Sequence, residues 1–156
     1  MAVQLALYQP DIPQNSGTLL RLGACLNVVV HIIHPTGFAF SDKLFRRSAM
    51  DYADHVRMIE HNCFDDFSTW CSKNSKRLVL MSTKASQSAY EFDFTSNDIL
   101  MAGRESAGVP QKVADVCATA IRIPMSKAVR SINVSVASAM VLGEALKQTG
   151  GFSQLT

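Results

Sequence analysis

The stretch Ile123-Pro124-Met125-Ser126-Lys127-Ala128-Val129-Arg130-Ser131-Ile132-Asn133-Val134-Ser135 joins a polar loop to a segment without charge. From 131 to 143 there is no Asp, Glu, Lys, Arg or His. We therefore expect a helix over 132–148 that is buried on nearly every side and closed by Gly150-Gly151. Polar side chains held against a rigid, dry helix are what a binding site requires. A loop that only caps a core helix would look the same, so this stretch alone leaves both interpretations open.

Outward from this stretch, strand and helix patterns alternate along the chain. The sequence predicts strands over 3–8, 28–33, 77–82, 98–102 and 118–123, with a weaker strand over 55–59. It predicts helices over 17–26, 41–47, 65–72, 110–116 and 132–148. Two prolines indicate a turn over 10–15, with Asn15 or Ser16 as the helix cap, and 83–96 is expected to be irregular. The alternation predicts an α/β fold, a mostly parallel sheet flanked by helices.

Composition narrows the class of protein. With 156 residues, 47% of them hydrophobic and 18% charged, we expect one globular domain over 1–156. A net charge of +2 argues against coating of nucleic acid by bulk electrostatics, although basic residues cluster locally. We expect no membrane span and no signal peptide, and hence a cytoplasmic protein. The four cysteines have no zinc spacing, so we expect buried reduced thiols and no metal site.

Three polar loops follow predicted strands, over 9–16, 103–110 and 124–133. Because the carboxyl ends of parallel strands meet at one edge of a sheet, these loops are expected to converge there. The middle loop contains Gly-x-Glu-x-x-Gly, which is not the dinucleotide fingerprint Gly-x-Gly-x-x-Gly. Within that loop, Gly103 would let a ligand approach the backbone, and Glu105 could bind a ribose hydroxyl or a cationic centre.

The combination of motifs is more specific than any one of them. In chain order they are Pro10-x-Ile12-Pro13-x-Asn15-Ser16-Gly17-x3-Arg21, then Gly103-x-Glu105-x-x-Gly108-Val109-Pro110, then Ile123-Pro124-Met125-x4-Arg130-Ser131-x-Asn133-x-Ser135. With these motifs the chain resembles the SPOUT superfamily of S-adenosylmethionine-dependent RNA methyltransferases. The stretch Asp42-Lys43-x3-Arg46-Arg47-Ser48-x2-Asp51-Tyr52 narrows the resemblance to the single-domain tRNA (cytidine(34)-2'-O)-methyltransferase type. The chain departs from that type modestly, with Ser16 where threonine is commoner and Ala102-Gly103-Arg104 in place of Phe-Gly-Pro.

The resemblance carries expectations that the residue patterns do not supply. It implies a deep trefoil knot over approximately 77–150, S-adenosylmethionine as cofactor with S-adenosylhomocysteine as product, and a homodimer. It implies 2'-O-methylation of the wobble nucleotide, a cytidine or modified uridine at position 34, in the tRNA anticodon stem-loop of leucine isoacceptors. Two alternatives stay open: 2'-O-methylation at another tRNA or ribosomal RNA site, and a non-catalytic RNA- or nucleotide-binding module.

The resemblance also assigns site residues position by position. The catalytic residues are Arg21, Asn15 and Glu105. The cofactor-binding residues are Met81, Gly103, Ile123, Ser131 and Asn133. From their clustered charge, Lys43, Arg46 and Arg47 are expected to bind RNA phosphates, although they could equally form a solvated helix face. Arg130 is expected either to bind RNA in the same way or to fix its loop by bonding backbone carbonyls. Because a guanidinium is a poor base, Arg21 either loses its proton in special surroundings or orients the hydroxyl and stabilises the developing alkoxide.

Overall fold

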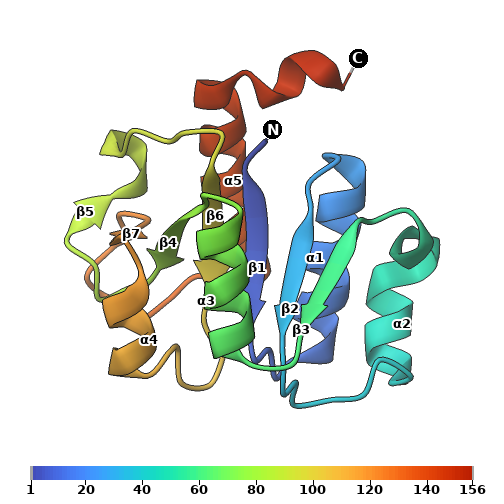
Figure 1. Ribbon diagram of the computed structural model, residues 1–156. Coiled ribbons are helices and arrows are strands. Elements are labelled where there is room, and N and C mark those ends of the chain that lie inside the picture. Colours follow the sequence, from blue (N-terminus) through green and yellow to red (C-terminus); the bar gives the residue numbers. More distant parts are fainter. Residues whose placement is uncertain (1, 156) are drawn as a thin grey trace.

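The protein is described by a computed structural model covering residues 2–155, built around one sheet (Figure 1). The sheet has seven strands in the order β3-β2-β1-β6-β4-β7-β5, and every neighbouring pair is parallel. The strands are β1 (Gln4–Tyr8), β2 (Val30–Ile33), β3 (Met58–His61), β4 (Arg77–Met81), β5 (Gln87–Ser88), β6 (Asp98–Ala102) and β7 (Thr119–Arg122). This topology confirms the predicted parallel α/β fold.

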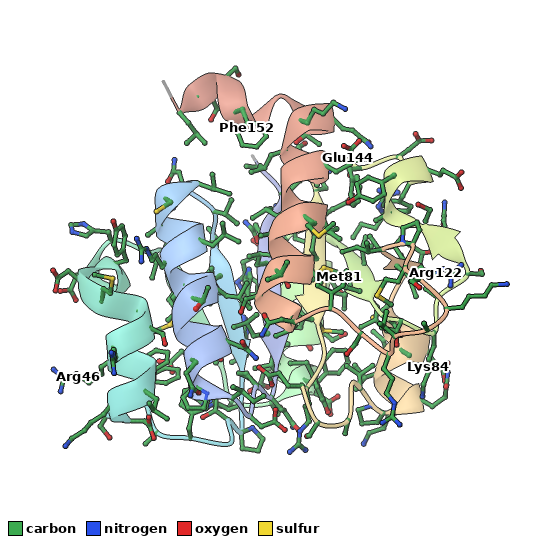
Figure 2. All side chains as sticks on the ribbon, turned by 180° about the vertical axis from the view of Figure 1, so that it is seen from behind. Arg46, Met81, Lys84, Arg122, Glu144 and Phe152 are labelled. Carbon is green, nitrogen blue, oxygen red and sulfur yellow. The ribbon has the colours of Figure 1, made fainter. Side chains whose placement is uncertain are left out.

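Helices cover both faces of the sheet (Figures 1 and 2). On one face lie α1 (Pro13–Cys25) and α5 (Val134–Thr149), and on the other lie α3 (Phe64–Lys73) and α4 (Gln111–Val116). A further helix, α2 (Lys43–Ala49), packs on the outside of α1. Short 3-10 turns occupy Met50–Asp54 (η1), Ala89–Glu91 (η2) and Gly151–Gln154 (η3).

Alternation along the strands divides the core into two layers. In β1, Leu5 and Leu7 point into the layer beneath α1 and α5, and Ala6 and Tyr8 point into the layer beneath α3 and α4. All four side chains are buried, as expected for a parallel strand covered on both faces. The sheet is therefore a rigid platform, and the loops at its carboxyl edge are held by well-packed strands.

The first helix begins earlier than the sequence predicted. It starts at Pro13, with Ile12 as the N-cap residue and no side-chain cap, so the prediction that Asn15 or Ser16 caps it is wrong. Proline is tolerated at the first helical position because the N–H there has no partner within the helix. The weak strand predicted over 55–59 lies instead at β3, and the segment 83–96 contains β5 and η2 rather than being wholly irregular.

The uncharged helix α5 is not buried on nearly every side. Val136 is 51% exposed and Met140 is 39% exposed, although Val141, Leu142 and Leu146 are buried. The helix thus has an apolar face that the chain itself does not cover. Its predicted end is confirmed, because Gly150 closes it in the left-handed conformation at φ 72°.

The prediction of buried thiols holds only in part. All four cysteines are free, but only Cys71 is buried; Cys117 is partly buried, and Cys25 and Cys63 are exposed. Cys25 is the last residue of α1, where the helix leaves the core.

Candidate functional site

A cavity of about 860 Å³ lies at the carboxyl edge of the sheet, where the loops after β4, β6 and β7 meet the start of α5. All five residues predicted to bind a cofactor line it: Met81, Gly103, Ile123, Ser131 and Asn133. Asn15, Glu105 and Arg130 line the same cavity. The expectation that three polar loops converge is therefore confirmed. A cavity of this size is within the range that holds a cofactor-sized ligand.

Asn133 connects the cavity wall to two helices. Its Oδ1 accepts hydrogen bonds from the backbone N–H groups of Ser135 (2.8 Å) and Val136 (3.3 Å), so it caps the start of α5. Its Nδ2 donates to Asn15 Oδ1 at 3.0 Å. Ser135 Oγ also donates to Asn15, with both the carbonyl and Oδ1 at 3.3 Å. Asn15 is buried, and its side chain therefore serves as the joint between α1 and α5.

A reciprocal clamp ties the loop after β1 to the loop after β6. The backbone N–H of Asp11 donates to Glu105 Oε2 at 3.0 Å, and the backbone N–H of Glu105 donates to Asp11 Oδ1 at 3.2 Å. Ser106 Oγ donates to Asp11 Oδ2, and Arg104 Nε lies 3.8 Å from the same oxygen. Asp11 was not predicted as a site residue. Its position between Pro10 and Pro13 in the first motif was a sequence signal that could have indicated it.

The two carboxyl groups of this clamp titrate in opposite directions. Hydrogen bonding with the Glu105 side chain lowers the pKa of Asp11, with smaller contributions from Ser106 and Arg104. Burial raises the pKa of Glu105, and its hydrogen bond with Asp11 raises it further. Asp11 therefore carries the negative charge of the pair, and Glu105 is the group that can hold a proton beside the cavity.

Two glycines allow the middle loop to fold tightly. Gly108 has φ +63°, and a Cβ on Gly103 would lie 2.7 Å from the carbonyl carbon of Gly108. Side chains at either position would strain or open the bridge that joins Arg104 to Gly108. Gly103 was predicted to let a ligand approach the backbone. In the structure it also lets the backbone of Gly108, in the same loop, come close.

Ser138 adds a polar group that the motifs did not single out. It lies on α5, is 1% exposed, and lines the cavity. Its Oγ has no hydrogen-bond partner among the described residues. A buried hydroxyl without a partner costs free energy unless a ligand or water satisfies it, so this atom is a natural contact for a polar ligand.

The mouth of the cavity is basic. Besides Arg130, it is lined by Lys84, Arg104 and Arg122, all exposed. Arg104 faces Asp11, whereas the other three make no ion pair in the part of the chain that is described. For a chain of net charge +2, this is a strong local concentration of positive charge. Lys84 and Arg122 were not among the predicted site residues.

Arg21 is not part of the cavity wall. It lies six residues after Asn15 on α1, so the two side chains point about 120° apart around the helix. The Arg21 side chain is exposed and turns towards η1, where Nη1 donates to Met50 Sδ at 3.3 Å. Its Cζ lies 4.9 Å from the centre of the Tyr52 ring. The structure therefore brings Asn15 and Glu105 to the cavity but leaves Arg21 on another side of α1.

The predicted basic helix is also separate from the cavity. Lys43, Arg46 and Arg47 are exposed on α2, whose start is capped by Asp42 through the backbone N–H groups of the first turn. In Figure 2, Arg46 lies at one side of the molecule and Lys84 and Arg122 lie at the other, with Met81 between them next to α5. One copy of the chain thus presents two basic regions on opposite sides.

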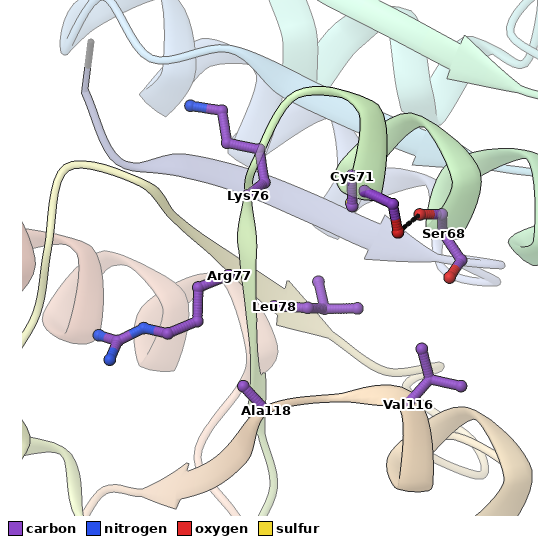
Figure 3. Close-up of a pocket in the computed structure, with 8 residues that line it drawn as sticks. Ser68, Cys71, Lys76, Arg77, Leu78, Val116 and Ala118 are labelled. Atoms are coloured by element: carbon purple, nitrogen blue, oxygen red, sulfur yellow. Dashed lines mark hydrogen bonds between the residues drawn. The ribbon is translucent and has the colours of Figure 1, made fainter.

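A smaller hollow of about 290 Å³ lies near the amino end of β4, between α3 and the segment that follows α4 (Figure 3). Arg77 in its wall is already bound by Asp98, with Nε at 2.6 Å and Nη2 at 2.8 Å from the two carboxylate oxygens. Burial raises the pKa of the Cys71 thiol there to about 11, which makes it a poor nucleophile at neutral pH. We assign no ligand to this hollow.

No helix among residues 2–155 has both the length and the apolar character needed to cross a membrane.

Comparison with known proteins defines the family. Residues 2–143 match the model of the SpoU rRNA Methylase family. A tRNA (cytidine(34)-2'-O)-methyltransferase of Beijerinckia indica subsp. indica is 54% identical over 151 residues, covering 97% of this chain and 94% of that protein. The chain therefore belongs to the SpoU methylase family, as the resemblance to the SPOUT superfamily implied.

Solved structures agree with this placement. One, described as giving structural insights into the 2-OH methylation of C/U34 on tRNA, superposes with a TM-score of 0.89 at 36% identity, covering 94% of this chain and 95% of that one. The SpoU methyltransferase AviRb from Streptomyces viridochromogenes, solved in complex with the cofactor AdoMet, has a TM-score of 0.86 at 21% identity. The match covers 94% of this chain and 60% of the AviRb chain, and at that identity the likeness concerns the fold alone.

Proposed function

We propose that this protein is an S-adenosylmethionine-dependent tRNA 2'-O-ribose methyltransferase that acts on the wobble nucleotide, position 34. The observation that carries the proposal is that residues from all three motifs line the same cavity. The relative from Beijerinckia indica, similar over almost its whole length, carries the name of this activity. Because tRNA is present in the cytoplasm, we place the activity in that compartment.

The residues around the cavity fit S-adenosylmethionine. Met81 and Ile123, at the ends of neighbouring strands, offer apolar surfaces for an adenine, and the unpartnered Ser138 Oγ offers a hydrogen bond. Ser131 and the backbone at Gly103 can bind further polar groups. The cofactor supplies an activated methyl group on a sulfonium, and the chain supplies position and exclusion of water. The same contacts would hold the product, S-adenosylhomocysteine.

We assign Arg21 to orienting the ribose hydroxyl. A guanidinium is a poor base and a good hydrogen-bond donor, so its role here is to orient the hydroxyl and stabilise the developing alkoxide. The hydroxyl proton then passes to water or to a nearby RNA phosphate. Glu105, whose pKa is raised by burial, is positioned to contact a ribose or the cofactor from inside the cavity.

The separation of Arg21 from the cavity supports a homodimer. The apolar face of α5 formed by Val136 and Met140 is exposed in one copy, beside α1 and the cavity. Burying such a face against a second copy would remove apolar surface from water and bring together elements that one chain keeps apart. We propose that each complete site combines one subunit's cavity with Arg21 of the partner subunit.

Mixed dimers test this arrangement. Arg21→Ala should abolish methyl transfer yet leave cofactor binding by calorimetry unchanged, and Ser131→Trp should fill the cavity and block cofactor binding. Each variant alone is expected to be inactive. Co-refolded, they should recover about a quarter of the wild-type rate, because half of the dimers are mixed and each of these has one intact site. Recovery of no activity would show that Arg21 serves its own subunit.

We further propose that the carboxy-terminal part of this single domain, approximately residues 77–150, is knotted. In support, α5 follows β7 near one edge of the sheet but packs against β6, η2 and α1. Stretching single molecules from both ends tests the knot, because a tightened knot leaves the unfolded chain shorter than its full contour length.

The activity is tested by incubating the protein with labelled S-adenosylmethionine and total tRNA, followed by mapping of the methylated nucleotide. Label at the 2'-oxygen of position 34, in leucine isoacceptors, is the expected result. Because the family model is named for ribosomal RNA, ribosomal RNA is the second substrate to assay. Methylation of ribosomal RNA alone would replace the tRNA proposal. Absence of label in both RNAs would favour the alternative of a non-catalytic RNA- or nucleotide-binding module.

A further inference from the structure

We infer that the Met50–Tyr52 segment, at the junction of α2 and η1, is a positioning device for the Arg21 guanidinium. This inference deepens the proposed function and rests on it, because the role of Arg21 in methyl transfer belongs to that proposal. The segment contacts Arg21 and lies outside the cavity of its own chain, so within one subunit its residues bear on the reaction through the arginine.

The close packing of α2 on α1 brings the residues that follow α2 near Arg21. A Cβ on Gly17 would lie 2.6 Å from Ser48 Cβ and 2.7 Å from the backbone nitrogen of Ala49, so the absence of a side chain lets the end of α2 touch α1. Arg21 follows Gly17 by four residues and therefore lies one turn further along the same face of α1. The next residues of the chain after α2, which begin at Met50, thus arrive beside the arginine.

The backbone at Met50 turns the segment onto Arg21. Met50 has φ 50° and ψ −141°, a conformation that residues with a side chain rarely adopt. The turn ends α2 and starts η1, which places Met50 Sδ and the Tyr52 ring on the same guanidinium. A rarely adopted backbone conformation of this kind persists where the surrounding structure requires it. Here it allows Met50 and Tyr52 to contact the same side chain, Arg21.

The two contacts hold the guanidinium in place and leave most of its N–H donors free. Tyr52 contacts it through the ring face, at 4.9 Å from Cζ, and the thioether of Met50 is a weak acceptor for one Nη1–H. Among the described residues, Arg21 makes no hydrogen bond to a carboxylate or carbonyl and no ion pair. Its remaining donors stay free for a ribose hydroxyl or a phosphate, while its long side chain is held in one direction.

Substitutions at Tyr52 test the inference with a matched pair. Tyr52→Phe keeps the ring and should retain wild-type kcat, whereas Tyr52→Leu removes it and should lower kcat about tenfold through misplacement of the guanidinium. In Tyr52→Leu the KM for S-adenosylmethionine and the melting temperature should stay close to wild type, which a merely structural role would not predict. In an Arg21→Lys background, whose ammonium is not held by the ring in the same way, the Tyr52→Leu effect should largely disappear.

A readout independent of activity separates this inference from the proposed function. In NMR spectra of the whole protein, the Arg21 side-chain N–H resonances should shift in Tyr52→Leu but not in Tyr52→Phe, because the ring face shields them. If the shift occurs and wild-type protein transfers no methyl group, the contact stands and the proposed function fails. Equal kcat losses in both variants, an unchanged kcat in Tyr52→Leu, or no shift in its spectrum would overturn the positioning role.

Discussion

At the scale of single residues, Asp11 shows how a side chain outside the predicted set shapes the site. It accepts hydrogen bonds from Glu105 N–H and Ser106 Oγ, faces Arg104, and donates its own N–H to Glu105. One carboxylate thus fixes three consecutive residues of the middle loop. A charged acceptor is suited to this role because hydrogen bonds to ionised groups are stronger than those between neutral groups.

We predict that Asp11→Ala loosens this loop and weakens cofactor binding by about tenfold, because Gly103 and Glu105 lose their fixed place in the cavity wall. Calorimetric titration with S-adenosylmethionine measures the change. Asp65→Ala is the control, since Asp65 is an exposed carboxylate in the first turn of α3 and is not among the residues that line the cavity. Equal affinity in the Asp11 variant and wild type would show that the clamp has no bearing on the cavity.

At the scale of elements, α2 presents a basic face on the far side of α1 from the cavity of its own chain. Its seven residues are fixed at the start by Asp42 and along one side by the packing against Gly17. Lys43, Arg46 and Arg47 therefore project from a rigid base. Such a base is suited to phosphate contacts that set the position of an RNA stem.

If α2 binds the anticodon stem, replacing Lys43, Arg46 and Arg47 by alanine should weaken tRNA binding. The slope of log K against log salt concentration should fall by roughly one for each phosphate that the variant no longer neutralises. Binding measured over a salt series checks this, with Lys112→Ala on α4 as the control for simple loss of charge. A slope identical to that of wild type would assign the three residues to a solvated helix face.

The elements also show what the sequence could reveal. The alternation of strand and helix patterns along the chain was enough to predict the parallel sheet and the loops that converge at its edge, because both follow from local sequence patterns. The start of α1 at Pro13 was missed because Asn15 and Ser16 look like caps, whereas Asn15 in fact bonds Asn133 and Ser135, more than a hundred residues away. The spacing of six residues from Asn15 is enough to place Arg21 on another side of α1. Its contacts with Met50 and Tyr52 could not be predicted, since they depend on how α2 packs against α1.

At the scale of the whole molecule, two buried histidines link β2 to β3 beneath α3. His31 Nδ1 lies 2.9 Å from His61 Nε2, and His31 Nε2 lies 2.9 Å from Gln4 Oε1. Burial lowers the pKa of His31 to about 3, with the neighbouring His61 and Lys76 lowering it further. Burial also lowers the pKa of His61, partly offset by Asp66. No local pattern in the chain indicated this pair, because the two residues meet only when β2 and β3 are aligned in the sheet.

These histidines predict sensitivity to acid. Since the folded pKa of His31 lies below its unfolded value of 6.5, the unfolded chain binds more protons, and stability falls as the pH drops below 6.5 towards 3. The loss from His31 should be about 2 kcal/mol at about pH 5. Urea unfolding at neutral and acid pH measures it. His31→Gln should flatten the pH dependence, whereas His34→Gln, a change in a half-exposed surface pair with Glu60, should not. Parallel curves for all three proteins would contradict this account.

The cap that Asn133 places on α5 has a consequence for solvent exchange. The amide protons of Ser135 and Val136 are held by an oxygen whose own side chain forms the cavity wall and is bonded to Asn15. They can exchange with deuterium only when that wall opens, so a ligand in the cavity should slow both amides far more than those in the last turn of α5. The first turn of this helix is thus a built-in reporter of cavity occupancy, readable without any measurement of catalysis.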